Sequence, residues 1–390
     1  MNAYRRIETD PARWFAADEV AKAKEYQRPL TRMRIVKTLV SLGAILAIVS
    51  THVVPRLVDA VGSTSWPVRF LLAFAFILVV FTLIDLPFSI WTTFVHEKRW
   101  EFSTETPAGF VADEVKGLLL SCVLFGGIGL LLWWAIRSSE LWWILAWVGF
   151  LLFSVVLALI LPIVILPMFN KFSALEDSGL AERLRALARS AGLNISEVQV
   201  MDASKRTRKD NAFFAGVGGT RRIVLFDNLL TQPESSIASI VAHEIGHWRR
   251  RHIAQQIVLG TMLSFGLFVL LRLVSTWDAA LSWAGVSSLS DPASLPLVAL
   301  VFVVGNAVLG FVQSWVSRAF ERQADVVALE LTEDPDAFVK VMRELATKNL
   351  SDLAPSWWAY VRASHPPAAE RLQLAEVWLS ERRTESVGSA

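Results

Sequence analysis

The sequence predicts a mainly α-helical fold, in which a polytopic bundle of about six transmembrane helices carries a cytoplasmic α/β domain. The first observation is composition: the 390 residues are 54% hydrophobic and include 16 tryptophans, and the mean hydropathy is +0.45. Ordinary soluble domains are less apolar, and membrane proteins use tryptophan as an interfacial anchor. The second is a set of six apolar stretches of about 20 residues, the length that crosses a bilayer as a helix. The third is a polar segment after the fourth stretch that mixes helical and strand patterns.

These patterns divide the chain into five parts. We expect a cytoplasmic N-terminal arm at 1–34, four spans within 35–168, a cytoplasmic α/β subdomain at 169–252, two spans within 253–317 and a C-terminal helical part at 318–390. The six spans are placed at residues 35–54, 67–91, 114–136, 141–168, 253–275 and 295–317, and two prolines, Pro162 and Pro167, could break the fourth. No cleavable signal peptide is expected, because the first apolar run begins only near Ile35.

The charged residues predict the orientation of the bundle. The 55–66 loop has one arginine and the 276–294 loop has no lysine or arginine, whereas residues 169–252 and the C-terminal tail are rich in both. By the positive-inside rule the basic parts face the cytoplasm. The net charge of +2 predicts no nucleic-acid partner.

A few polar or reactive side chains lie inside the apolar stretches. They are consistent either with a water-filled chamber or with local hydrogen bonds between helices. These residues are Asp85, Gln255, Gln256, Asn306 and Gln313. The single Cys122 excludes an internal disulfide and a multi-thiolate metal site, and its apolar surroundings predict a small buried side chain.

The strongest chemical signal is the segment VAHEIGHW at residues 241–248. His243 and His247 are four residues apart, so on a helix both imidazoles leave the same face and could bind one metal ion. Glu244 lies beside them, where it could take a proton from a metal-bound water, as in HExxH metalloproteases. Thr231 or Ser235 could cap the helix. The alternative is a chance match, expected in about one chain in a hundred of this length.

We expect the helix of the sixth span to continue through residues 318–325, and this extension is expected to supply a third ligand. Glu321 and Asp325 are four residues apart and share a face. A catalytic zinc needs one ligand beyond two histidines, with the fourth position left for water. We assign Glu321 to this role and Asp325 to the ring N–H of a ligand histidine. The alternative is a pair of solvated helix charges.

Two further segments are candidates for substrate contact. Residues 212–217 and 223–226 read as a hairpin turning at Gly218-Gly219, and its exposed edge, beginning at Asn211-Ala212, could accept a substrate backbone as an added strand. Alternatively, Asn211 simply ends the preceding basic loop. His365, on a loop before two prolines, is a candidate donor to the transition state, although a lone loop histidine is more often merely exposed.

At this point the chain resembles the type I CAAX prenyl endopeptidases, which are integral-membrane zinc metalloproteases of the gluzincin kind. Four ordered blocks carry the resemblance, with weaker similarity near residues 25–32 and 95–116. The blocks are NAFFAGVGGTRRIVLFDNLL (211–230), VAHEIGHW (241–248), AFERQAD (319–325) and SHPPAAERL (364–372).

The resemblance implies a function and a set of site residues. It implies a zinc metalloendopeptidase with one Zn²⁺ per chain, a ring of transmembrane helices around a large chamber, and a protease domain on the cytoplasmic side. The zinc ligands would be His243, His247 and Glu321, and Glu244 would be the general base. Substrate would be held by Asn211 and Ala212, with His365 and Arg371 near the scissile carbonyl. Eukaryotic members have seven spans; six are counted here, and the missing one corresponds to their first.

The resemblance leaves the biology open. The substrate would be a peptide or protein that is membrane-bound or lipidated, and the membrane would be the plasma membrane in a bacterium or otherwise the endoplasmic reticulum. One alternative is a quality-control protease that uses the same zinc chemistry to degrade damaged membrane proteins. The other is a catalytically inactive transporter or scaffold, which would bind no zinc.

Overall fold

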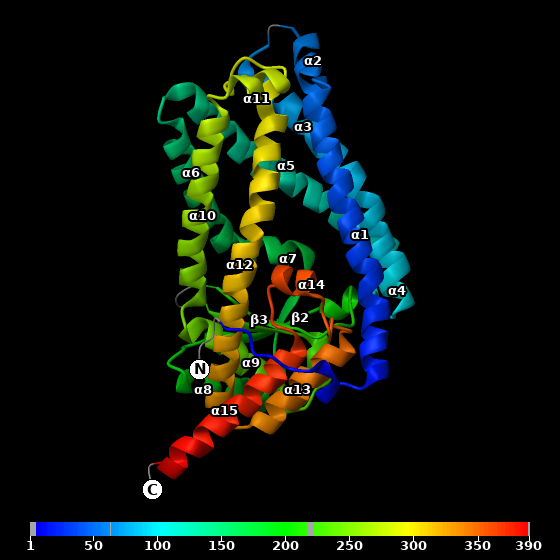
Figure 1. Ribbon diagram of the computed structural model, residues 1–390. Coiled ribbons are helices and arrows are strands. Elements are labelled where there is room, and N and C mark those ends of the chain that lie inside the picture. Colours follow the sequence, from blue (N-terminus) through cyan, green and yellow to red (C-terminus); the bar gives the residue numbers. More distant parts are fainter. Residues whose placement is uncertain (1–4, 63, 217–220, 389–390) are drawn as a thin grey trace.

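The computed structural model describes residues 5–62, 64–216 and 221–388 and is mainly helical (Figure 1). The membrane part is built from the following helices: α1 (Ala17–Ser50), α2 (Val53–Ala60), α3 (Trp66–Ile90), α4 (Glu97–Arg99), α5 (Pro107–Ser138), α6 (Trp142–Ile160), α7 (Leu166–Phe169), α10 (His252–Val274), α11 (Asp278–Trp283) and α12 (Leu295–Thr332). The remaining elements are β1 (Phe172–Ala174), α8 (Ser178–Ser190), β2 (Glu197–Met201), β3 (Ala212–Ala215), β4 (Arg222–Phe226), α9 (Glu234–Arg249), α13 (Pro335–Lys348), α14 (Trp357–Arg362) and α15 (Ala368–Gly388).

The described residues contain six helices that are long and apolar enough to cross a membrane, which confirms the predicted fold class. They form a closed ring. In the order α1, α3, α5, α6, α10 and α12, each helix packs against the next, and α12 packs against α1. The short helices α2 and α11 lie at one end of this ring, and the sheet, α8, α9, α13 and α15 lie at the other (Figure 1).

Helix boundaries differ from the predicted spans because charged turns extend apolar helices. Helix α1 runs without a break from Ala17 to Ser50, across the arm boundary expected at residue 34. The expected continuation of the sixth span is confirmed, because α12 runs through Thr332 and one 38-residue helix joins the membrane to the site. The break expected in the fourth span is a π turn, Leu161–Ile165, which contains Pro162 and leads into α7.

The middle of the ring lacks buried side chains among the described residues. A hydrophobic core fills the end near α2 and α11, with Phe70, Trp133 and Phe268 among its buried members. Toward the sheet, no described residue is buried in the following segments of the six helices: 27–44, 74–90, 107–125, 147–160, 253–263 and 306–317. The shortest of these has 11 residues, which at about 1.5 Å per residue spans about 16 Å. A solid bundle would bury one face of each helix along its whole length, so we interpret this belt as a chamber wall.

Polar side chains lie in the same belt. Lys37 of α1 and Asp85 of α3 form an ion pair, with 3.1 Å between Nζ and Oδ1, and each side chain is more than 40% exposed. A pair of charges in the apolar part of a membrane normally faces water or protein rather than lipid. The prediction that Cys122 is buried was wrong: it is exposed on α5, because a membrane helix can turn apolar side chains outward.

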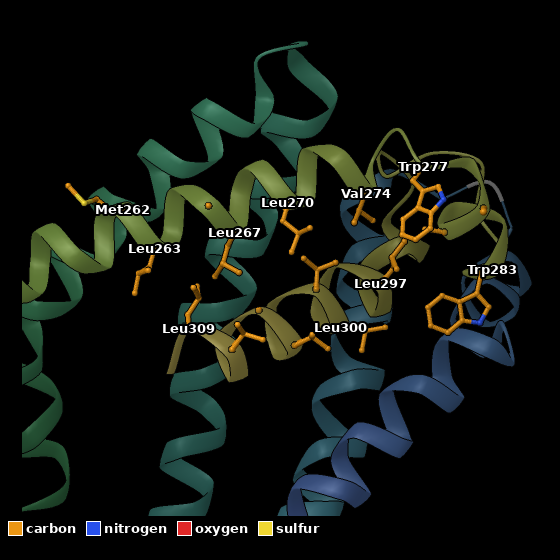
Figure 2. A pocket seen from close by; sticks show the side chains of 17 residues that line it. Met262, Leu263, Leu267, Leu270, Val274, Trp277, Trp283, Leu297, Leu300 and Leu309 are labelled. Carbon is orange, nitrogen blue, oxygen red and sulfur yellow. The ribbon is translucent and has the colours of Figure 1, made fainter. Parts of the chain in front are cut away.

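A hollow of about 710 Å³ lies between α10 and α12 near the packed end. Figure 2 shows Leu267, Leu270, Leu297 and Leu300 of the two helices directed toward each other around it. Its lining is apolar and includes no titratable side chain. It therefore lacks the groups that hydrolysis requires, and the chemistry must lie elsewhere.

The α/β part contains one four-stranded sheet in the order β1-β2-β4-β3. β2 and β4 are parallel, with Val198 opposite Ile223, and the outer strands are antiparallel to their neighbours. Strand β1 was not predicted from the sequence. The predicted hairpin exists as β3 and β4, and β3 is an edge strand; the predicted Gly218-Gly219 turn lies outside the described residues.

Candidate metal centre

Helix α9 carries the HExxH segment through the core of the α/β part. Ile237, Val241 and Ile245 are at most 1% exposed, which anchors the helix on its apolar face. The predicted caps were wrong, because the helix begins at Glu234 behind Pro233 without a side-chain cap. The Thr231 hydroxyl instead donates to the carbonyl of Asn228 in the preceding turn.

A close helix contact brings the third candidate ligand to α9. A Cβ placed on Gly246 would lie 2.8 Å from both Cα and O of Ala324 on α12. Only a residue without a side chain allows the two backbones to approach so closely. Glu321 lies one turn before Ala324, so this contact sets the distance between its carboxylate and the histidines of α9.

Three ligand atoms converge where α9 meets α12. Nε2 of His243 and Nε2 of His247 are 3.3 Å apart, and each is 3.3 Å from a different oxygen of Glu321. Each of the three residues can offer one ligand atom such that all lie within 4.8 Å of one another. Glu321 is 5% exposed and its Oε2 is buried without a hydrogen-bond partner. A buried carboxylate that has one unsatisfied oxygen and faces two imidazole nitrogens fits a bound cation.

The outer nitrogen of the first histidine is held by a carboxylate. Nδ1 of His243 is 2.8 Å from Oδ1 of Asp325. Arg371 binds both oxygens of Asp325 with its guanidinium fork, and its Nε lies 2.8 Å from Oδ2. An Nδ1–H donated to Asp325 leaves the Nε2 lone pair of His243 free for a metal.

The burial of Glu321 and Asp325 distinguishes a metal site from a pair of solvated helix charges. Asp325 is 0% exposed, so neither it nor Glu321 is a solvated helix charge. Burial and the Arg371 guanidinium lower the pKa of His243, but the two carboxylates outweigh them and raise it to about 10. A metal that binds this ring must therefore displace a proton. The pKa of Glu244 is raised by burial, although the neighbouring imidazoles oppose the shift.

His365 lies over the same carboxylate. Its side chain is 61% exposed, and its Nε2 is 3.4 Å from Oε1 of Glu321. The loop that carries it is held by α12, where Nη1 of Arg318 donates to the carbonyl oxygens of Ala363, at 2.6 Å, and Val361. His365 is thus an exposed imidazole fixed at the mouth of the site.

The edge strand presents backbone groups beside α9. The N–H of Phe226 donates to the carbonyl of Asn211 at 3.0 Å, so alternation in the antiparallel ladder turns the N–H and C=O of Ala212 and Phe214 toward the free edge. The Ala212 N–H meets the side-chain oxygen of Asn211 at 2.9 Å. Asn211 therefore directly precedes the strand, and its side chain accepts from the first N–H on the free edge.

Direct contacts join the three predicted ligands to Asp325, His365 and Arg371. Arg371 was expected near the scissile carbonyl, but its contacts are with Asp325 and His243. His252 and Gln323, which lie behind His247, were not among the residues predicted from the sequence. The sequence signal for His252 was its position five residues after His247, a predicted ligand.

Comparison with known proteins places the chain in a family. The model described as "Peptidase family M48" matches residues 174–379. The model described as "CAAX prenyl protease N-terminal, five membrane helices" matches residues 4–171. The chain belongs to peptidase family M48. The second description has five membrane helices, whereas the described residues within 17–169 contain four candidate spans.

Relatives in the family cover most of the chain. CAAX prenyl protease 1 of Saccharomyces cerevisiae is 33% identical over 77% of this chain and 70% of that protein. The Bacillus subtilis protein named uncharacterized metalloprotease YhfN is 29% identical over 96% of this chain and 89% of that protein. The crystal structure of S. mikatae Ste24p superposes with a TM-score of 0.84 at 25% identity, covering 96% of this chain and 95% of the other.

These findings confirm the enzyme class predicted from the sequence. The chain is a membrane zinc metalloendopeptidase, and its helices make it an integral membrane protein. The comparisons do not favour the quality-control alternative or the inactive transporter or scaffold.

Proposed function

We propose that His243, His247 and Glu321 hold one Zn²⁺ per chain and that Glu244 is the general base of peptide-bond hydrolysis. The convergence of three ligand atoms within 4.8 Å carries this proposal. Two imidazoles and one carboxylate are a known catalytic ligand set for zinc, which keeps the fourth position for water or substrate. When bound, the ion supplies Lewis-acid catalysis, because it polarises the substrate carbonyl and makes water acidic enough to lose a proton near pH 7.

The remaining steps belong to side chains and backbone of this chain. Glu244 takes the proton of the attacking water and delivers it to the leaving amine, a role that its raised pKa favours. His365 donates a hydrogen bond to the oxyanion. The free edge of β3 holds the substrate backbone through Ala212 and Phe214, with the Asn211 side chain released from the Ala212 N–H when substrate binds. Arg371 positions Asp325, and through it His243.

The decisive experiment separates metal binding from proton transfer. We expect purified Glu244→Gln to keep about one zinc per chain by elemental analysis and to lose at least about 100-fold in kcat, because an amide cannot accept the proton. Glu234→Gln is the matched control: it lies on the same helix, with its side chain 55% exposed. Undiminished turnover in Glu244→Gln would remove Glu244 from the mechanism.

We further propose that the substrates are membrane-associated proteins of the CAAX type. The support is the name of the relatives, CAAX prenyl protease 1, together with the unpacked belt between the site and the packed end of the ring. Proteoliposomes should cleave a prenylated CAAX peptide with a kcat/KM at least about tenfold above that of the same peptide without lipid. Equal values would count against recognition of the lipid.

We also propose that the site faces the cytoplasm. The sheet, both described ends of the chain and the basic run 249–251 lie at one end of the ring (Figure 1), and the positive-inside rule assigns that end to the cytoplasm. Impermeant maleimide should label Ser288→Cys in intact cells and Glu381→Cys only after lysis, in a chain carrying Cys122→Ser. The reverse pattern would invert the topology.

A further inference from the structure

A third histidine lies against the metal centre without being one of its candidate ligands. His252 is the first residue of α10 and is 1% exposed. Its ring stacks on Phe320 with the centroids 4.2 Å apart and the planes 8° from parallel. The turn before it contains Arg251 with φ of 56°, which folds the start of α10 back over α9. Burial, stacking and the turn leave the ring little freedom to rotate.

Both nitrogens of His252 have partners. Its Nε2 is 3.1 Å from the side-chain oxygen of Gln323, and its Nδ1 is 3.0 Å from Nδ1 of His247. An amide oxygen only accepts, so Nε2 of His252 carries the hydrogen and Nδ1 of the neutral ring is the acceptor. The hydrogen between the two rings therefore belongs to His247. Its Nδ1–H donates to His252, and its Nε2 lone pair is left facing Glu321.

The two ligand histidines thus have chemically different partners. His243 donates to the carboxylate of Asp325, whereas His247 donates to a neutral imidazole. Nothing else in the described contacts holds Nδ1 of His247. If the hydrogen moved to Nε2, the ring would present a donor instead of a lone pair to the metal position.

We propose that His252, oriented by Gln323, is a positioning residue that fixes the tautomer and the ring plane of His247 for metal binding. This inference rests on the proposed role of His247 as a metal ligand. Loss of such an outer hydrogen bond typically weakens metal binding by about 10-fold to 100-fold. Because Gln323 lies on α12 and His252 on α10, the pair also ties two helices of the membrane ring to the ligand helix α9.

Two substitutions separate hydrogen bonding from packing. His252→Phe keeps an aromatic ring over Phe320 and removes the acceptor, whereas His252→Asn removes the ring and keeps an acceptor oxygen close to the position of Nδ1. We expect the zinc dissociation constant, measured by chelator competition on the purified full chain, to rise about 10-fold to 100-fold in His252→Phe. It should stay within about threefold of the unsubstituted chain in His252→Asn. The Co²⁺ absorption spectrum should shift only in His252→Phe.

Controls make the outcome decisive. His52→Phe, at the other end of the ring, where the His52 ring contacts the carbonyl of Trp283, should leave zinc affinity unchanged. If His252→Phe does not fold, Gln323→Leu removes the partner of His252 and should weaken zinc binding in the same direction. Unchanged affinity in folded His252→Phe or Gln323→Leu, or equal losses in His252→Phe and His252→Asn, would overturn the inference. Unchanged affinity in His247→Ala would instead refute the proposed ligand set.

Discussion

Substituting Gly246 by alanine tests whether the close contact of α9 and α12 builds the site. Intrinsic helix propensity alone favours alanine over glycine by up to about 1 kcal/mol. The structure predicts the opposite sign, because the new Cβ would lie 2.8 Å from Cα and O of Ala324. Both obstructing atoms are backbone, so no side-chain rotation can relieve the overlap.

The size of the effect follows from that distance. Ordinary van der Waals contact begins near 3.4 Å, so the helices must separate by about 0.6 Å. Overpacking of this kind costs about 1–3 kcal/mol, and ligand sets tolerate displacements of only about 0.5 Å. Glu321 lies one turn from Ala324, so we expect zinc affinity to fall at least about tenfold, which is about 1.4 kcal/mol, and kcat/KM to fall with it.

The assay compares two glycines. Gly246→Ala and Gly149→Ala are purified in the same detergent, and zinc affinity, the melting midpoint and peptide cleavage are measured. Gly149 lies inside α6, and nothing lies within 4 Å of the position that a Cβ would take there, so its alanine variant should match or exceed the stability of the unsubstituted chain. A Gly246→Ala protein that binds zinc and melts like Gly149→Ala would refute the argument.

Three other predictions follow from the contacts of the site. Asp325→Asn should raise the zinc dissociation constant by about 10-fold to 100-fold. The amide can turn an N–H toward His243, and it no longer balances the charge of Arg371. A zinc affinity within twofold of that of the unsubstituted chain would contradict this. His365→Ala should lower kcat by about 100-fold to 1,000-fold while zinc content stays near one per chain, and loss of zinc would instead make His365 a ligand. Removal of the metal by a chelator should abolish cleavage and lower the melting midpoint, because an ion present at about 1,000 times its dissociation constant stabilises the folded chain by about 4 kcal/mol. Cleavage should recover fully with added zinc but not with magnesium. A protein that melts identically without metal would argue against an ion joining α9 and α12.

Several elements were predictable because their information is local. The spacing of His243 and His247 places both rings on one helix face wherever that helix lies. The Asp334 cap of α13 is also a local signal, and its carboxylate accepts from the Ala337 N–H at 2.9 Å. The six spans follow from apolar length alone. The error lies at the arm boundary expected at residue 34, because α1 continues through charged turns from Ala17.

Other features depend on residues far apart in the chain. The spacing of Glu321 and Asp325 is compatible both with a metal ligand and with solvated charges. The hydrogen bond from Arg371, 46 residues away, to the buried Asp325 favours the metal site. The role of Arg318 at the His365 loop and that of His252 behind His247 were likewise invisible, because each depends on where a second helix lies.

The membrane-spanning helices, the HExxH pair and the family resemblance could be predicted without a structure, since each depends on neighbours in the chain or on ordered blocks. The approach of α12 to Gly246, which lets Glu321 meet both imidazoles, could not. Nor could the groups that hold the outer nitrogens of those rings. Ligation and hydrogen bonding act over about 3 Å, and the packing of helices distant in sequence sets such distances.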